Sequence, residues 1–147
     1  SLLSHVLAEN ACLESLIAAL GAEDQALDDR RFDELPALLR RKEGVLDRLA
    51  EIDQARESVQ RQLGLAEGRQ GTEAAAQSDP ALLGAVETLV ERAERARELN
   101  RIVAAKVYTH LQFAADALSF LKAPAARLYG RDGAHAAPIG GSSLAIG

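Results

Sequence analysis

The apolar residues of this chain recur at helical intervals along three long segments. In the first segment, from about residue 2 to residue 29, one row repeats every seven residues: Val6, Leu13, Leu20 and Leu27. A companion row mixes apolar and polar residues: Leu3, Asn10, Ile17 and Asp24. Two such rows form the packing seam of a helix. Asn10 is expected to lie in this seam and to set its register through a hydrogen bond to a neighbour.

The second segment, from about residue 33 to residue 63, has the same spacing in Leu38, Val45, Ile52 and Val59, beside Leu35, Lys42, Leu49, Arg56 and Leu63. Asp33 is expected to cap this helix, and Pro36 falls in its first turn, where proline is tolerated. Lys42 and Arg56 are expected to pack their aliphatic stems and to hold their charges outside the seam. Because only a few residues join the first two helices, they should form an antiparallel hairpin.

The third segment is the longest, from about residue 80 to residue 123. Its predicted seam has one row at Leu83, Val90, Arg97, Ala104, Leu111 and Leu118, and another at Val86, Ala93, Asn100, Val107, Ala114 and Leu121. Asp79 supplies a cap, Pro80 fits the first turn, and Pro124 ends the helix. At about 1.5 Å per residue this helix is about 60 Å long, against about 45 Å for each helix of the hairpin. Part of it is therefore expected to extend past the hairpin.

The remaining segments are expected to lack regular structure. Residues 64–78 contain three glycines and several polar residues, which predicts a linker. Residues 124–147 are rich in Ala, Pro, Gly and Ser, which predicts a flexible C-terminal tail. The predicted fold is all-α: a coiled-coil-like bundle domain over residues 1–123, made of a long antiparallel hairpin and a longer third helix, followed by the tail.

Composition and charge narrow the function. The chain has 147 residues, one cysteine and a net charge of −5 with mixed signs, so a disulfide framework and nucleic-acid binding are not expected. We read no leader and no membrane-spanning run, and expect a cytoplasmic protein without membrane insertion. Glu9, Glu14 and Glu23 are most simply charges on the flanks and the surface of the helix. A carboxylate pair for acid/base chemistry is the lesser alternative, because no partner base accompanies them. No metal-binding or nucleophile motif accompanies the three histidines or the serines, so we expect no enzyme, no metal and no cofactor.

The aromatic residues concentrate late in the chain, where Tyr108, Phe113, Phe120 and Tyr129 are four of the five. In the third helix, large apolar residues lie on more than one side, which requires more than one neighbour. Two interpretations of Phe113 and Phe120 are open. Either the hairpin or a second copy of the chain covers them, or they form a surface for another protein's helix.

Several segments resemble one known family. Arg97-Glu98-Leu99-Asn100, Leu118 through Leu121-Lys122, and Leu128-Tyr129-Gly130-Arg131-Asp132-Gly133 are similar to the FlgN flagellar export chaperones, as is the hairpin around Glu23–Leu27 and Leu38–Leu46. The Leu-Tyr-Gly-x-Asp-Gly segment is the more specific part. One departure is that Val103 and Ala104 stand where family members often have asparagine and glycine.

The resemblance implies a cytosolic chaperone that binds the terminal helices of hook-filament junction (hook-associated) proteins, prevents their premature assembly and delivers them to the flagellar type III export gate. The implied substrate-binding residues are Leu99, Ile102, Val103, Val107, Leu111, Phe113, Leu118 and Phe120. Tyr129, with Gly130 and Gly133 in the turn, matches the tyrosine associated with the export gate, although it could also fasten the tail to the helices. The alternative is a structural coiled-coil protein or adaptor that forms a homodimer through the same residues.

Overall fold

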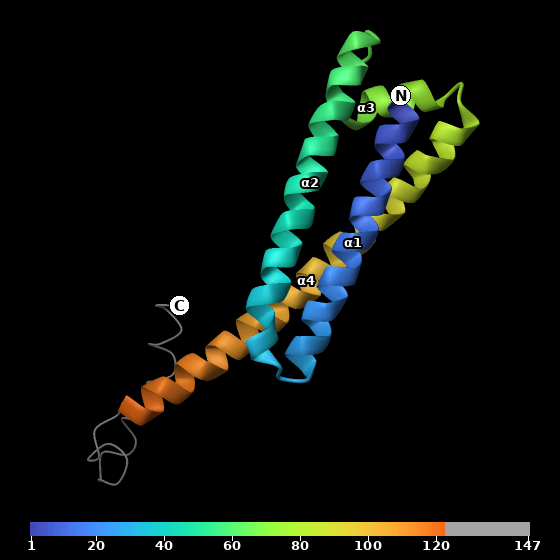
Figure 1. Ribbon diagram of the computed structural model, residues 1–147. Helices are drawn as coiled ribbons and strands as arrows, with labels where there is room; N and C mark the ends of the chain where they lie inside the picture. Colours follow the sequence, from blue (N-terminus) through green and yellow to red (C-terminus); the bar gives the residue numbers. More distant parts are fainter. Residues whose placement is uncertain (123–147) are drawn as a thin grey trace. The chain divides into compact units, whose positions relative to one another are not determined.

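The computed structural model describes residues 1–122, and this part of the chain is almost entirely helical. The helices are α1 (Leu2–Asp28), the short 3₁₀ helix η1 (Phe32–Glu34), α2 (Leu35–Gln62), α3 (Gly68–Ala76) and α4 (Pro80–Lys122) (Figure 1). No strand occurs within these residues, so the predicted all-α class is confirmed. The tail predicted for residues 124–147, including Tyr129, Gly130 and Gly133, lies outside the described residues.

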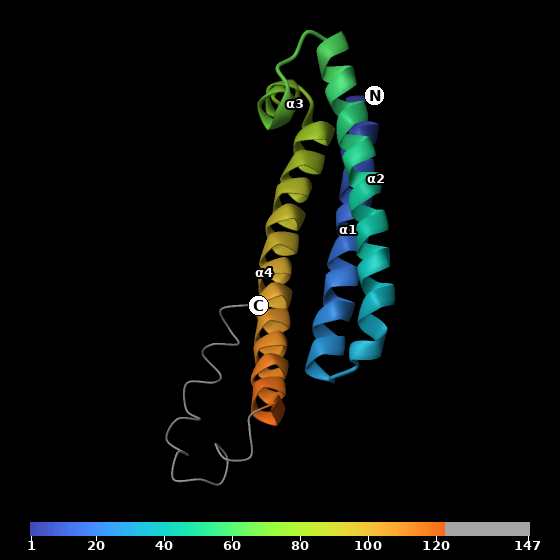
Figure 2. The same cartoon turned by 90° about the vertical axis from the view of Figure 1, so that its left-hand side faces the viewer.

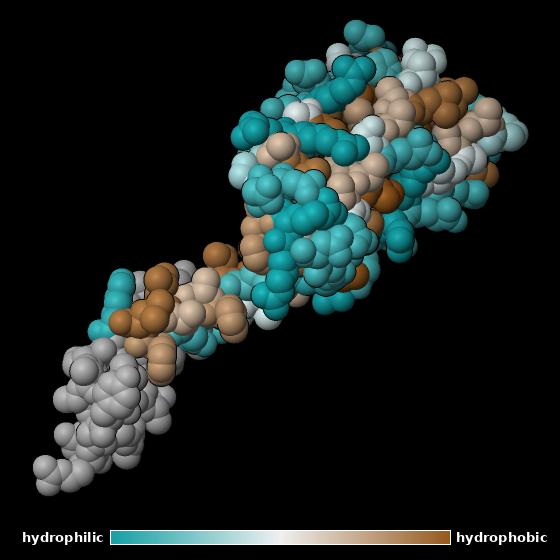
Figure 3. Space-filling model, turned by 60° about the horizontal axis from the view of Figure 1, so that its bottom comes forward, coloured by the Kyte–Doolittle hydropathy of each residue, from teal (hydrophilic) through white to brown (hydrophobic). Residues whose placement is uncertain are grey.

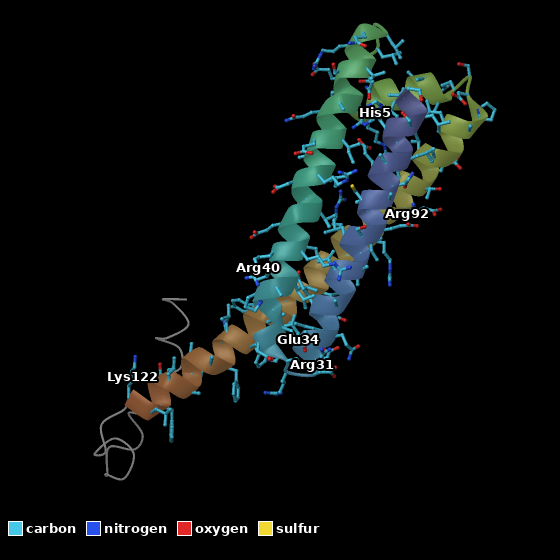
Figure 4. All side chains as sticks on the ribbon, viewed as in Figure 1. His5, Arg31, Glu34, Arg40, Arg92 and Lys122 are labelled. Carbon is cyan, nitrogen blue, oxygen red and sulfur yellow. The ribbon has the colours of Figure 1, made fainter. Side chains whose placement is uncertain are left out.

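Helices α1 and α2 form the predicted antiparallel hairpin and lie side by side along their length (Figures 1 and 2). The chain reverses at Arg30, which has a positive φ of 57°. Arg31 then donates to Glu34 at 2.5 Å, and both side chains lie at this turn (Figure 4). The prediction that Asp33 caps the second helix is wrong, because residues Phe32–Glu34 form η1 and Glu34 occupies the cap position without a side-chain hydrogen bond.

Helix α1 lies between α2 and the first part of α4. The predicted row Val6, Leu13, Leu20 and Leu27 is buried, and so are other apolar side chains around the helix: Leu2, Cys12, Leu16, Ala19 and Ala26. Leu2 and Val6 share a core with Leu82, Ala85 and Val86 of α4 and with Ala76 of α3, while Glu9 contacts α2. A helix that is apolar on most sides needs neighbours on most sides, and α1 has α2 on one side and α4 on another.

Helix α1 is also long and apolar enough to cross a membrane by length and composition alone. The core helix of a soluble protein passes the same test, and 44% of the relevant window is buried inside the structure. The expectation that no apolar run approaches the length of a membrane span is therefore wrong for α1.

The prediction of an unstructured linker over residues 64–78 is wrong at its centre, where α3 forms over Gly68–Ala76. Side chains of α2 hold this helix at its start. Gln60 donates to the carbonyl oxygens of Ala66 and Gly68 at 2.7 and 3.1 Å, and Glu57 accepts from the Gly68 amide at 2.8 Å. These contacts come from another helix, and the composition of residues 64–78 contains no sign of them. The composition alone therefore did not predict α3.

Helix α4 begins as predicted, with the Asp79 carboxylate accepting from the Leu82 amide at 3.2 Å. Its packed face agrees with the predicted seam only in part. Val86, Val90 and Ala93 are buried or half-buried, as predicted. Leu83 and Arg97 are exposed, and a row one residue earlier is buried or half-buried in their place: Leu82, Leu89, Ala96 and Val103. Leu83 and Val90 line an open cleft of about 610 Å³ beside α3. Asn100 is exposed, so it is not a buried register residue.

Contacts divide the chain into two units, of which the first is Ser1–Val103 and the second begins at Ala104. The first unit contains α1, η1, α2, α3 and the first part of α4. The described part of the second unit is the helix over residues 104–122. The domain boundary predicted at residue 123 remains a prediction.

Candidate functional site

A buried network of charged and polar side chains stabilises the first unit. Arg56 of α2 donates to Glu9 of α1 at 2.8 Å, to Gln60 at 2.5 Å and to Thr72 of α3 at 2.8 Å. Arg56 also pairs with Asp53. The expectations that Glu9 is a surface charge and that Arg56 holds its charge outside the seam are therefore wrong. Each group is desolvated, and the other supplies the compensating charge.

Burial and the contacts between the two groups shift the pKa of both Glu9 and Arg56. It raises the pKa of Glu9, even though the hydrogen bond and charge of Arg56 act in the opposite direction. Burial acts to lower the pKa of Arg56, but the hydrogen bonds and charges of Glu9 and Asp53 outweigh it, so the pKa of Arg56 is raised overall. The network joins three helices, and its arrangement is that of a structural ion pair.

Two further polar contacts fix the register of the helices. Glu23, which is buried, pairs with Lys42 at 3.1 Å, so Lys42 also turns its charge inward, contrary to expectation, and Glu23 is not a surface charge. Asn10 is buried and donates to the Ala85 carbonyl oxygen of α4 at 2.9 Å, which confirms its predicted role. Glu14 is exposed, as expected, and pairs with Arg92 of α4 (Figure 4).

The candidate functional surface lies on α4 within the second unit. Six large apolar side chains between residues 104 and 122 are more than half exposed: Tyr108 63%, Leu111 64%, Phe113 68%, Leu118 55%, Phe120 61% and Leu121 77%. We call this set the α4 apolar surface. Figure 3 shows apolar side chains, in brown, at the surface of the last described turns of α4, next to the grey atoms. Scattered apolar residues are normal on protein surfaces, but six large ones exposed within nineteen residues mark this part of α4 as a candidate surface for binding other proteins.

The predicted substrate-binding residues fall into two groups. Leu111, Phe113, Leu118 and Phe120 belong to the α4 apolar surface. Val103 is only 3% exposed, and Leu99, Ile102 and Val107 are half-buried. Val103 therefore belongs to the packed face of the first unit in this conformation.

Tyr108 and Leu121 are not among the binding residues predicted from the sequence. A signal for Leu121 was present, because the positions Ala104, Val107, Leu111, Ala114, Leu118 and Leu121 are separated alternately by three and four residues. Tyr108 lies three residues before Leu111, and it is therefore a neighbour of that side chain on the helix surface. Pattern alone does not distinguish an exposed row from a buried one.

The charge of this part of α4 differs from that of the preceding turns. Between residues 91 and 101 the helix carries seven charged residues, and most of them are exposed: Glu91, Arg92, Glu94, Arg95, Arg97, Glu98 and Arg101. Between residues 104 and 122 only Lys106, Asp116 and Lys122 are charged. The second unit therefore presents a surface suited to hydrophobic contact with another protein.

Comparison with known proteins gives one result. The family described as FlgN protein matches residues 1–137 of the chain. No curated protein and no solved structure was found to match. The family match covers both helices of the hairpin, α3, all of α4 and the Leu-Tyr-Gly-Arg-Asp-Gly segment. The chain therefore belongs to the FlgN protein family of flagellar export chaperones.

Proposed function

We propose that this chain is a cytoplasmic chaperone that binds the terminal helices of hook-filament junction proteins, prevents their premature assembly and delivers them to the type III export gate. The observation that carries the proposal is the α4 apolar surface in a member of a flagellar chaperone family. An amphipathic helix that is exposed before its own assembly needs its apolar side covered, and exposed leucine and phenylalanine side chains can cover it.

The mechanism is masking followed by release. Leu111, Phe113, Leu118 and Phe120 contact the apolar faces of the bound terminal helices, and Tyr108 and Leu121 enlarge the contact. Leu99, Ile102, Val103 and Val107 lie earlier on the same helix and are more deeply packed, so their side chains support the surface more than they contact the partner. The contact with the export gate is assigned to Tyr129, Gly130 and Gly133 on the family resemblance.

Calorimetry with the terminal helical segments of the junction proteins tests the binding step. The wild-type chain should bind, and Phe113→Ala combined with Phe120→Ala should weaken binding by at least about tenfold, since aromatic anchors carry much of the energy of such contacts. Because both side chains are largely exposed, helicity and melting temperature should change little. A loss of about 3 kcal/mol or more of folding free energy in the double variant would instead identify core aromatics.

The delivery step has a separate test. Tyr129→Ala should leave the affinity for junction proteins unchanged and should reduce their export from cells, because the proposal assigns Tyr129 to the gate and not to the substrate. Loss of substrate binding in this variant would contradict that division of roles.

The alternating spacing of Ala104, Val107, Leu111, Ala114, Leu118 and Leu121 also favours a second function, a coiled-coil dimer without an export role. Sedimentation over a range of protein concentrations distinguishes the two. A tight dimer that buries the α4 apolar surface at all concentrations would support the coiled-coil protein and contradict a free substrate-binding surface.

A further inference from the structure

The α4 apolar surface contains two rows on different sides of the helix. The leucine row contains Leu111 and Leu118, the smaller Ala104, Val107 and Ala114 complete its spacing, and Tyr108 and Leu121 flank it on either side. The phenylalanine pair contains Phe113 and Phe120. Each phenylalanine follows a leucine by two residues, and at 3.6 residues per turn two residues are about 160° apart the shorter way round the axis. The two rows therefore point in nearly opposite directions.

A single straight partner helix leaves one row uncovered. One neighbouring helix covers an apolar stripe of about 100°, which is less than the angle between the leucine row and the phenylalanine pair. The leucine and phenylalanine side chains of the two rows are more than half exposed, so both rows need a cover in the bound state. On one side the surface between the rows is polar: Gln112 and Ser119 lie midway between the rows, and Thr109 and Asp116 flank the phenylalanine pair.

The first unit already contains a helix with this pattern and shows what covers it. Helix α1 is buried on several sides and lies between two helices, with Glu9 contacting Arg56 of α2 and Asn10 contacting Ala85 of α4. Residues 104–122 have the residue pattern of such a middle helix but expose both of its apolar sides.

Pairing with copies of the same chain does not produce a closed complex. If the leucine row paired with a second copy, the phenylalanine pair would remain exposed on both chains. If the phenylalanine pair also paired with a copy, two self-complementary contacts on opposite sides of one helix would generate an open-ended assembly. One partner molecule that supplies two helices covers both rows and leaves no apolar row exposed for further copies. The low charge of residues 104–122 further requires that the contacting faces of these helices be apolar.

We propose that residues 104–122 act as the middle helix of a three-helix contact, in which one partner molecule supplies two amphipathic helices, one on the leucine row and one on the phenylalanine pair. This inference rests on the proposed function and specifies the form of its substrate. The bound segment is a pair of helices from one junction protein and not a single helical peptide.

Site-specific photo-cross-linking tests this arrangement in the full-length chain with a full-length junction protein as the probe. A benzophenone amino acid is placed at Leu118 in one variant, at Phe120 in another and at Ser119, midway between the rows on the polar side, as the control. Position 118 should link to one helical segment of the junction protein, position 120 to a second segment, and position 119 to neither. Links from 118 and 120 to the same segment, or to a second copy of the chaperone, would overturn the inference.

Paired substitutions give an independent readout by calorimetry. Leu111→Ser with Leu118→Ser and Phe113→Ser with Phe120→Ser should each weaken binding of the full-length junction protein by at least about tenfold. Gln112→Ala with Ser119→Ala, at the same spacing and midway between the rows on the polar side, should change it by less than about twofold. Circular dichroism verifies that each variant is helical. If only one row matters, the two-helix arrangement fails while the proposed function stands, and if wild-type protein does not bind, both fail.

Discussion

At the scale of single residues, the charged side chains in the hairpin seam are the feature whose position the periodicity predicted wrongly. Lys42 and Arg56 occupy seam positions, and long cationic side chains commonly extend from such positions to solvent. Here each has a buried glutamate opposite it, Glu23 and Glu9. Glu9 and Arg56 are 47 residues apart, so no local pattern indicates that they meet.

Removing one member of the buried pair should cost more than removing both. Arg56→Met leaves Glu9 without its cation in a desolvated position, and we expect a loss of about 3 kcal/mol or more in the free energy of unfolding. Glu9→Gln combined with Arg56→Met should recover a substantial part of this loss, because no buried charge is left unpaired. Urea unfolding of the two variants and wild type measures both effects. A single variant less than about 1 kcal/mol below wild type would contradict the role assigned to the pair.

At the scale of elements, α3 shows how a short helix can depend on its neighbour. Gly71 lies on the face of α3 that meets the residue 60–66 region, and a Cβ atom there would come within 1.8 Å of the Ala66 carbonyl oxygen and 2.6 Å of Gln60 Nε2. Because the closer atom belongs to the backbone, the helix or the preceding loop must shift. The close approach of α3 to the loop that precedes it therefore requires glycine at this position.

Gly71→Ala should consequently destabilise the first unit by about 1 to 3 kcal/mol through overpacking. Gly84→Ala is the matched control, since the added methyl group meets no atom within 4 Å and replaces glycine inside a helix, where alanine is favoured by about 0.5 to 1 kcal/mol. Urea unfolding should move the two variants in opposite directions. Equal stability of Gly71→Ala and wild type would show that α3 does not pack as closely as described.

In α4, the face that packs against the rest of the protein was harder to predict than the ends of the helix. Two seams with the same spacing run along it one residue apart, Leu82-Leu89-Ala96-Val103 and Leu83-Val90-Arg97-Ala104, followed by Leu111 and Leu118 in the second. Counting apolar residues favours the second seam because of its leucines after residue 104. The first seam packs in the first unit, where Leu82, Ala96 and Val103 are buried.

At the scale of the whole molecule, the sequence allows the helices of the hairpin and α4 to be located within two residues and allows the family to be named. The hairpin was predictable because α1 and α2 each carry apolar residues at seven-residue spacing along one face. The candidate site was predictable in part, since Leu111, Phe113, Leu118 and Phe120 stood out as large apolar residues. Their exposure depends on which seam of α4 packs, and this follows from tertiary contacts such as Asn10 with Ala85.

The measurement that tests the central claim most directly is amide hydrogen exchange of the chain, free and bound to a junction protein. The account predicts that binding slows exchange mainly between residues 104 and 122, because the α4 apolar surface becomes the interface, while α1 and α2 keep the protection they have in the free chain. Protection that appears in α1 or α2 and leaves residues 104–122 unchanged would contradict the assignment of this surface as the binding site.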